Sequence, residues 1–173
     1  MQHSRLNLFV TSAALGLLGL AVSPAQAATN SAPANANSII ITALTITKNT
    51  DLNFGTVVPG ATTGTIVIAP SAAGTQTCTT AICTGGGNSS AKFTLAGAAG
   101  YTAVMTIPAT VALTGPGPSM TATLSNSLTA NKLLLTGTAA DSFYVGGSLA
   151  VGTSALQTTG AYTGTFTVTV AYQ

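Results

Sequence analysis

The last fourteen residues of the chain alternate between apolar and polar side chains more regularly than any other stretch. Threonines and one alanine occupy the odd positions from 163 to 171. Because side chains alternate across a strand, this pattern predicts a terminal strand over 160–173 with one apolar and one threonine face. Its neighbour comes either from the same chain or from another polypeptide by strand addition. The apolar face consists of Tyr162, Phe166, Val168, Val170 and Tyr172.

Short apolar segments between glycine- and proline-rich turns predict further strands along the chain. Gly146 and Gly147 predict a bulge in the last of them. The stretch 78–88 is polar and glycine-rich, and we expect it to be irregular. Many short strands at close spacing predict an all-β chain folded as a β-sandwich. The predicted strands are 44–46, 65–69, 92–95, 101–107, 111–113, 120–124, 133–135 and 143–151.

The first 27 residues have the pattern of a secretory signal peptide. Arg5 supplies a positive charge, and residues 8–22 form an apolar stretch. Ala25-Gln26-Ala27 follows as a small-residue cleavage site, whereas the apolar stretch is short for a transmembrane anchor. We therefore expect a mature chain that begins at Ala28. It would be exported through the periplasm to the cell surface or the extracellular space.

Residues 28–43 are predicted to form an N-terminal arm that precedes a single domain, 44–173. The arm begins with ten small or polar residues, which are typical of flexible segments. Its apolar residues Ile39, Ile41 and Ala43 have the opposite parity to Leu44 and Ile46. Because a one-residue slip reverses the face of every side chain, the two groups can serve different sheets. The alternative is one strand that contains a bulge.

Charged residues make up 3% of the chain, which limits the chemistry that it can perform. Glutamate is absent, the aspartates are Asp51 and Asp141, and the one histidine lies in the predicted signal peptide. General acid–base catalysis needs titratable groups held together at the reacting atoms. Three scattered lysines form no basic patch for nucleic acid. We therefore expect neither an enzyme nor a nucleic-acid-binding protein, and we expect no metal or cofactor.

Cys78 and Cys83 are the two cysteines of the chain. Export implies an oxidising compartment, where two thiols separated by four residues can close a small disulfide loop. Loop-closure entropy gives such a bridge about 2 kcal/mol, so it would fix a loop and not the whole fold. Free thiols and an intermolecular bridge remain alternatives. A zinc site is unfavourable because no further ligand lies nearby.

Five stretches, in order, resemble a bacterial family catalogued as domain of unknown function four-four-zero-two. That family is similar to the spore-coat-U and chaperone–usher pilin groups, in which a glycine fourteen residues from the end precedes a penultimate aromatic residue. Gly160 and Tyr172 occupy those places here. The five stretches are Asp51-Leu52-Asn53-Phe54-Gly55, Ala91-Lys92-Phe93-Thr94-Leu95, Met120-Thr121, Val145-Gly146-Gly147-Ser148-Leu149 and residues 160–172.

The resemblance implies an incomplete immunoglobulin-like β-sandwich, which a donor strand completes. A periplasmic chaperone would supply this strand first, and a neighbouring subunit would supply it later at an outer-membrane usher. The chain would then be a structural subunit of a surface fibre, a homopolymer. Ile39, Ile41 and Ala43 would be donor residues, with Ile40 as the alternative anchor, and the apolar face of the terminal strand would line the acceptor groove. The rival hypothesis is a monomeric β-sandwich that binds carbohydrate or another surface.

Overall fold

A computed structural model describes residues 29–138 and 140–173. The predicted signal peptide, 1–27, lies outside the described residues. The chain divides into two units, Met1–Ser38 and Ile39–Gln173. In the first unit, residues 29–38 are exposed and have no regular secondary structure. No helix in the described part of the chain is long and apolar enough to cross a membrane.

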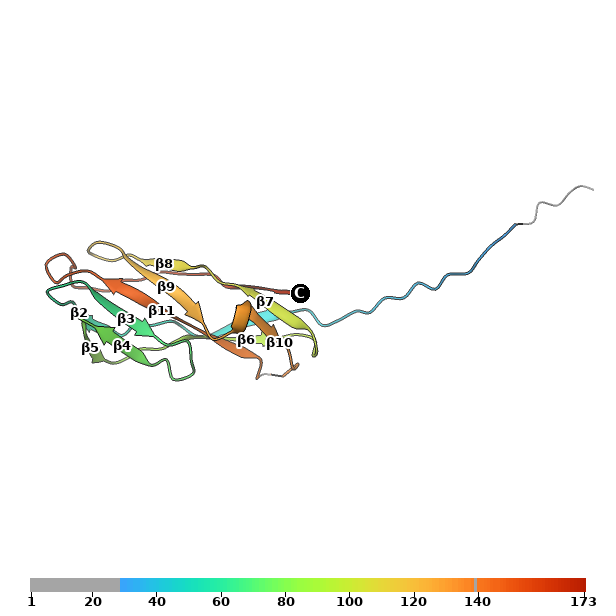
Figure 1. The fold of residues 1–173 in the computed structure, drawn as a ribbon, viewed down its shortest axis with the longest axis horizontal. Helices are drawn as coiled ribbons and strands as arrows, with labels where there is room; N and C mark the ends of the chain where they lie inside the picture. The colour runs from blue at the N-terminus through green and yellow to red at the C-terminus, as the bar shows by residue number, and fades with distance from the viewer. Residues whose placement is uncertain (1–28, 139) are drawn as a thin grey trace, which may run out of the picture. The chain divides into compact units, whose positions relative to one another are not determined.

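The second unit is all-β and has the layers of a β-sandwich (Figure 1). Most of the predicted strands are present, and their ends differ from the predicted ends by at most four residues. One short 3₁₀ turn, η1 (Thr129–Asn131), precedes β10. The strands are β1 (Thr45–Thr50), β2 (Thr56–Val58), β3 (Gly64–Ile68), β4 (Gln76–Thr79), β5 (Ile82–Gly85), β6 (Ala91–Ala96), β7 (Thr102–Thr106), β8 (Thr110–Leu113), β9 (Met120–Asn126), β10 (Lys132–Leu134), β11 (Ser142–Val151) and β12 (Thr169–Tyr172).

The strand β11 organises the larger sheet, in which every pairing is antiparallel. Its first half pairs with β6, its second half pairs with β3, and its middle pairs with β9. The strands β1, β4 and β8 extend this sheet to seven strands. A second sheet has the order β10-β7-β12, and β2 and β5 form a separate pair. The apolar side chains between these sheets form the core.

The predicted bulge in β11 is wrong, because residues 142–151 form one continuous strand. The two glycines serve close approach instead of a bulge. A Cβ on Gly146 would lie 2.2 Å from the carbonyl oxygen of Ile68, and one on Gly147 would lie 2.7 Å from that of Thr123. Glycine therefore lets the neighbouring backbones close on β11 from both sides where β11 changes partner from β6 to β3.

The prediction that 78–88 is irregular is also wrong, since the end of β4 and all of β5 lie there. β4 is an edge strand that pairs with β3, and β5 pairs with β2. Thr80 adopts a positive φ of 60° in the tight connection between them. Cys78 of β4 and Cys83 of β5 are joined by a disulfide, as predicted. Neither strand shows a clear alternation of apolar and polar residues. Each is therefore a strand because of its pairing with a neighbour, and not because of its own sequence pattern.

The core consists of two clusters of buried side chains. One cluster lies among β6, β7 and the start of β11, and includes Phe93 stacked on Phe143 with ring centroids 5.3 Å apart. The other includes Phe54, Ile66 and the end of β11. Few side chains pack against both clusters. They are Leu52, Leu124 and Phe166.

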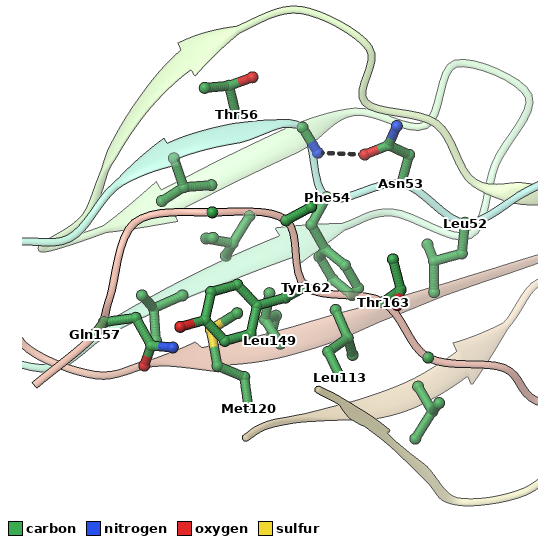
Figure 2. A pocket seen from close by; sticks show the side chains of 18 of the residues that line it. Leu52, Asn53, Phe54, Thr56, Leu113, Met120, Leu149, Gln157, Tyr162 and Thr163 are labelled. Carbon is green, nitrogen blue, oxygen red and sulfur yellow. Dashed lines mark hydrogen bonds between the residues drawn. The ribbon is translucent and has the colours of Figure 1, made fainter. Parts of the chain in front are cut away.

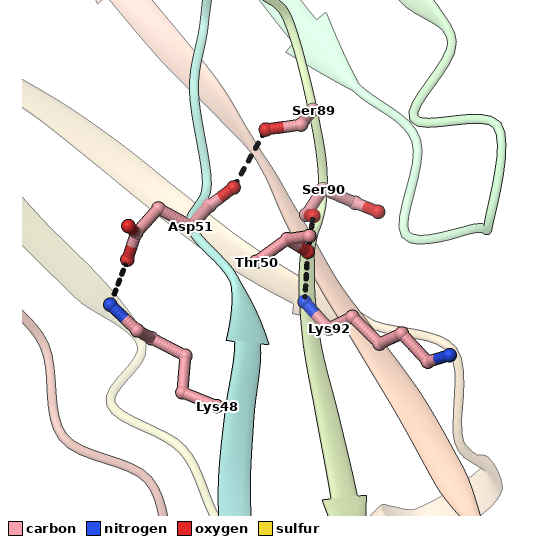
Figure 3. Close-up of polar contacts among 6 residues, drawn as sticks. All are labelled: Lys48, Thr50, Asp51, Ser89, Ser90 and Lys92. Carbon is pink, nitrogen blue, oxygen red and sulfur yellow. Dashed lines mark hydrogen bonds and ion pairs between the residues drawn. The ribbon is translucent and has the colours of Figure 1, made fainter.

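Polar contacts hold the chain against β6 after β1 ends (Figure 3). A register shift between Lys48 and Thr50 marks a bulge in β1. The Thr50 hydroxyl donates to the carbonyl of Ser90 at 3.0 Å, and the Ser89 hydroxyl donates to that of Asp51 at 2.7 Å. These bonds hold the chain beside β6 beyond the end of β1. The next residues, Leu52 and Phe54, then pack in the core.

Asp141 fixes the loop between β10 and β11. Its carboxylate is 3% exposed and accepts hydrogen bonds from the Thr136 hydroxyl at 2.7 Å and the Gly137 backbone N–H at 3.0 Å. Burial raises the pKa of Asp141, but hydrogen bonds from Thr136 and from backbone N–H groups lower it by more. The pKa therefore lies below the ordinary value of 3.8. The ionised carboxylate is part of the folded loop.

We predict that Asp141→Asn lowers the free energy of unfolding at pH 7 by about 1–3 kcal/mol, because a neutral amide accepts these hydrogen bonds poorly. A lowered folded-state pKa gives stability that is present above the unfolded pKa and lost as the pH falls through the folded pKa. Urea midpoints at pH 7 and pH 3 measure both effects. The wild type should lose this contribution below about pH 4, and the variant should not. A variant that equals the wild type at pH 7 would contradict the assignment.

Candidate functional site

The terminal segment, residues 160–173, pairs along only part of its length. β12 pairs with β7 over Thr169–Tyr172, and Thr163 forms an isolated bridge with Thr114 beyond β8. Between them, residues 164–168 run without turn or bend and belong to no strand. The prediction of one paired strand across 160–173 is therefore wrong for its central part.

The neighbouring chain explains this interruption. The bridge and the start of β12 are six residues apart on the terminal segment, but their partners, Thr114 and Thr106, are eight residues apart. The stretch that faces the terminal segment, from Thr106 to Thr114, therefore contains two extra residues. Pro108, which has no N–H group to donate, lies in this stretch. Continuous pairing across this point is prevented.

The terminal segment nevertheless has two different faces. Val168 is buried, and the other four apolar residues predicted for this face are half-buried. The threonines at 163, 165, 167 and 169 are exposed. Phe166 lies against Phe93, with ring centroids 6.5 Å apart. The alternation that was predicted from sequence is therefore present in the burial pattern, even where strand pairing is absent.

One edge of the terminal segment is open. Alternate residues of a strand direct their backbone groups to the same side, and Thr163 and Gln173 bond toward β8 and β7. The N–H and C=O groups of Gly164, Phe166 and Val168 therefore point away from those strands. Among the described residues, these three form no backbone hydrogen bond. This edge can accept another strand.

The open edge borders an apolar groove with a volume of about 700 Å³ (Figure 2). One wall is residues 157–164 with Phe166, and the opposite wall is the segment 51–57, which we call the lip. Figure 2 shows Phe54 and Leu52 entering from the lip, opposite Tyr162. The floor belongs to the core cluster that contains Ile66. It consists of Ile66, Val111, Leu113, Met120, Leu149 and Val151.

The groove is almost uncharged. Asp51, at its rim, is the one charged residue that lines it, and Lys48 pairs with it at 2.5 Å in an exposed ion pair. Within the described residues, no group of three or more His, Cys, Asp or Glu side chains could hold a metal ion. The groove therefore suits an apolar occupant with a backbone that needs hydrogen bonds.

Two tyrosines of the terminal segment bond to the chain around them. The Tyr162 hydroxyl accepts from the Gly117 N–H at 2.9 Å and donates to the carbonyl of Thr158 at 2.8 Å. The Tyr172 hydroxyl accepts from the Ala98 N–H at 2.7 Å and donates to the carbonyl of Thr42 at 2.8 Å. Tyr172 therefore ties the start of the domain to its last strand.

None of the predicted donor residues belongs to a strand, and Ile39 and Ile41 lie before this tie. The side chains of Ile39 and Ile40 are 85% and 96% exposed, and that of Ile41 is 36% exposed. Ala43 is exposed and follows Thr42 directly. By contrast, Leu44 packs against the core. The change of parity that the sequence showed thus coincides with a change from exposed to packed side chains.

Sequence reasoning missed most of the groove. Leu113, Met120 and Gln157 line it but come from two paired strands and a turn that are far apart in the chain. Val57 was not assigned to a strand, because the three-residue β2 exists through its pairing with β5. The tetrapeptide Gly-Pro-Gly-Pro before Met120 was the one available signal, since it marks the loop that Tyr162 contacts.

The chain belongs to the family described as domain of unknown function (DUF4402), whose model matches residues 44–172. The match begins at the residue where packing against the core begins and includes both walls of the groove. No curated protein and no solved structure matches the chain significantly.

We predict that Val168→Asp destabilises the domain by more than about 2 kcal/mol, because it buries a carboxylate with no partner. Thr167→Asp is the matched control on the exposed face and should change stability by less than about 0.5 kcal/mol. Chemical denaturation of both variants measures the difference. Equal losses would show that the terminal segment is not two-sided in solution.

We predict that Tyr172→Phe lowers the free energy of unfolding by about 0.5–1.5 kcal/mol, since the half-buried Ala98 N–H and the exposed carbonyl of Thr42 each lose a hydrogen bond. Amide exchange should locate the effect. The Ala98 N–H should exchange faster in the variant, while amides of the cluster around Ile66 should not. Unchanged exchange at Ala98 would contradict the hydrogen bond between the Ala98 N–H and the Tyr172 hydroxyl.

Proposed function

We propose that this chain is a secreted structural subunit of a bacterial surface fibre, which polymerises by donor-strand exchange. The observation that carries the proposal is the groove, in which an open strand edge borders apolar side chains that are only half-buried, among them Leu113, Met120 and Phe166. Both features are unfavourable in water, and one inserted strand would remove both. A strand added to a sheet edge gains main-chain hydrogen bonds and fills pockets with alternate side chains.

The chemistry of the arm complements the groove. The arm is uncharged, and its isoleucines are exposed in the second unit. Burying each isoleucine would contribute about 1.5–3 kcal/mol. We place Ile39 and Ile41 in the groove and Ile40 on the outer face, with the opposite assignment if the register is offset by one. Ala43 would lie at the groove mouth, because Thr42 is bonded to its own Tyr172.

The ends of the domain favour assembly from head to tail. Thr42 lies with Tyr172 at the C-terminal end, and β2, which overlaps the lip, lies at the opposite end (Figure 1). The 14 residues from Ala28 to Ile41 can extend about 45 Å. A donor that runs antiparallel to the terminal segment places its own domain beyond the acceptor's β2 and β5. Such a contact joins unlike surfaces, and its repetition gives a filament.

The proposal also names the partners. The groove must be covered before assembly, and a periplasmic chaperone that lends a strand would cover it. An outer-membrane usher would then exchange that strand for a subunit's arm. A monomeric binding module is the competing proposal, since pockets of 300–1,000 Å³ also hold small ligands. The two proposals differ in whether the arm is needed for assembly.

We predict that deletion of Ala28–Ile41 abolishes fibres and leaves subunits bound to a chaperone. Moving the same segment to a position after Gln173, through a short flexible linker, should give a stable monomer. Linking makes strand capture intramolecular, and the linker turns the segment back along the terminal segment in the antiparallel direction. Size analysis of unboiled samples, from a host that also expresses a periplasmic chaperone and an outer-membrane usher, distinguishes a ladder of oligomers from a monomer.

Point variants in the full chain provide the control. Ile39→Asp combined with Ile41→Asp should stop assembly, whereas Ile40→Asp should permit it. The reverse result would indicate the offset register. If the arm-deleted chain folds alone as a stable monomer with a closed core, or if all the variants assemble equally, donor-strand exchange is refuted and the binding module becomes the better hypothesis.

A further inference from the structure

We propose that the Cys78–Cys83 disulfide positions the lip of the groove, so that oxidation of this pair makes the subunit competent to capture a donor strand. This inference rests on the proposed function and adds a means of regulation to the same groove. It follows from where the two cysteines lie in the strand register. It does not require the bridge to stabilise the fold as a whole.

The lip depends on a small sheet of its own. β2 pairs with β5 and, among the described strands, with no other. Within this pair, Val57 lies opposite Cys83. Val57 is also a groove residue of the lip. The position of Cys83 therefore determines where this part of the lip lies.

The other cysteine belongs to the floor side of the groove. Cys78 lies opposite Ile66 in the pairing of β4 with β3, and Ile66 is a fully buried residue of the floor. The Cα atoms of Cys78 and Cys83 are 6.1 Å apart. The disulfide therefore connects the strand beside the floor directly to the strand behind the lip. Both cysteines and Val57 pack against the same core cluster.

Without the disulfide, the lip would have few connections to the main sheet. An isolated two-stranded sheet is marginally stable in water. The Gln76 side chain would still donate to the carbonyl of Phe54 at 2.6 Å, and the Asn53–Ser89 bridge would remain. Phe54 would therefore stay in the core while residues 56–58 loosened. A loose lip must be ordered at the moment of strand capture, which weakens capture.

The redox step is ordinary thiol–disulfide exchange. The two thiols lose two protons and two electrons as the S–S bond forms, and a disulfide oxidant takes these up and becomes a dithiol. Thiols stay reduced in a cytosol and are oxidised in a periplasm. A subunit with this device would therefore assemble only after export.

The test uses the full mature chain, 28–173, in three forms: oxidised, reduced with a dithiol, and Cys78→Ala combined with Cys83→Ala. Amide exchange at residues 56–58 and 82–85 should be about tenfold or more faster in the last two forms, while amides of β11 remain protected. Formation of the oligomer ladder should slow by a similar factor. The dithiol should have no effect on the alanine variant, which controls for the reagent.

Two variants separate the lip from general stability. Thr84→Val removes the hydrogen bond from the Thr84 hydroxyl to the carbonyl of Thr56 and leaves the disulfide intact. It should loosen the lip and slow assembly. Val145→Ala, in the other core cluster, should lower the denaturation midpoint and leave lip exchange unchanged. If assembly falls equally in Val145→Ala, it follows global stability and the inference fails.

The outcomes also distinguish this inference from the proposed function. If the oxidised wild type forms no ladder, the fibre proposal fails, and lip exchange alone then decides whether the disulfide positions the lip. If the wild type assembles equally well when oxidised and reduced, the fibre proposal stands and this inference is overturned. Equal amide exchange at 56–58 in the oxidised and reduced forms would also overturn it.

Discussion

The two halves of the core are joined by few side chains, and two of these belong to the walls of the groove. Leu52 reaches the core from the lip and Phe166 reaches it from the terminal segment, and each packs against both clusters. A β-sandwich is stable only when its layers exclude water from a shared interior. The two walls of the groove therefore also connect the two clusters of the core, through Leu52 and Phe166. An occupant between them would complete the contact of both clusters at once.

The terminal segment keeps its two faces across the interruption of its pairing with β7 and β8. The two extra residues around Pro108 break the hydrogen-bonded ladder, but the side chains continue to alternate on either side of the break. Gly164 contributes to this arrangement, because a Cβ there would lie 2.2 Å from the carbonyl oxygen of Ala112. The backbone therefore lies close against β8, and its opposite edge faces the groove.

Much of the fold could be predicted from the sequence, because alternation and turn residues report local structure directly. The all-β class, most of the strands and the apolar face around Phe166 follow from such patterns. The short strands β2 and β5 could not be found in this way, since each exists through its pairing with the other. Continuity of β11 was missed because glycine in a strand signals either a bulge or close approach, and only tertiary neighbours distinguish the two.

The candidate site was predictable for one wall only. The apolar face of the terminal segment is visible in the alternation of its sequence. Met120 and Leu113, by contrast, reach the floor because β8 and β9 pair with each other, which no local pattern shows. The position of the disulfide behind the lip likewise depends on the register of β2 with β5 and of β3 with β4, and no local sequence pattern encodes either register.

The tie between Tyr172 and Thr42 has a mechanical consequence for a fibre of such subunits. Tension from a neighbouring subunit would enter each domain beside Tyr172 and leave through the groove at the other end. The pull would then act along β1 and the terminal segment, perpendicular to the hydrogen bonds of their ladders. Bonds loaded in this direction share the force and must break together, so the fibre would resist stretching far better than its individual contacts suggest.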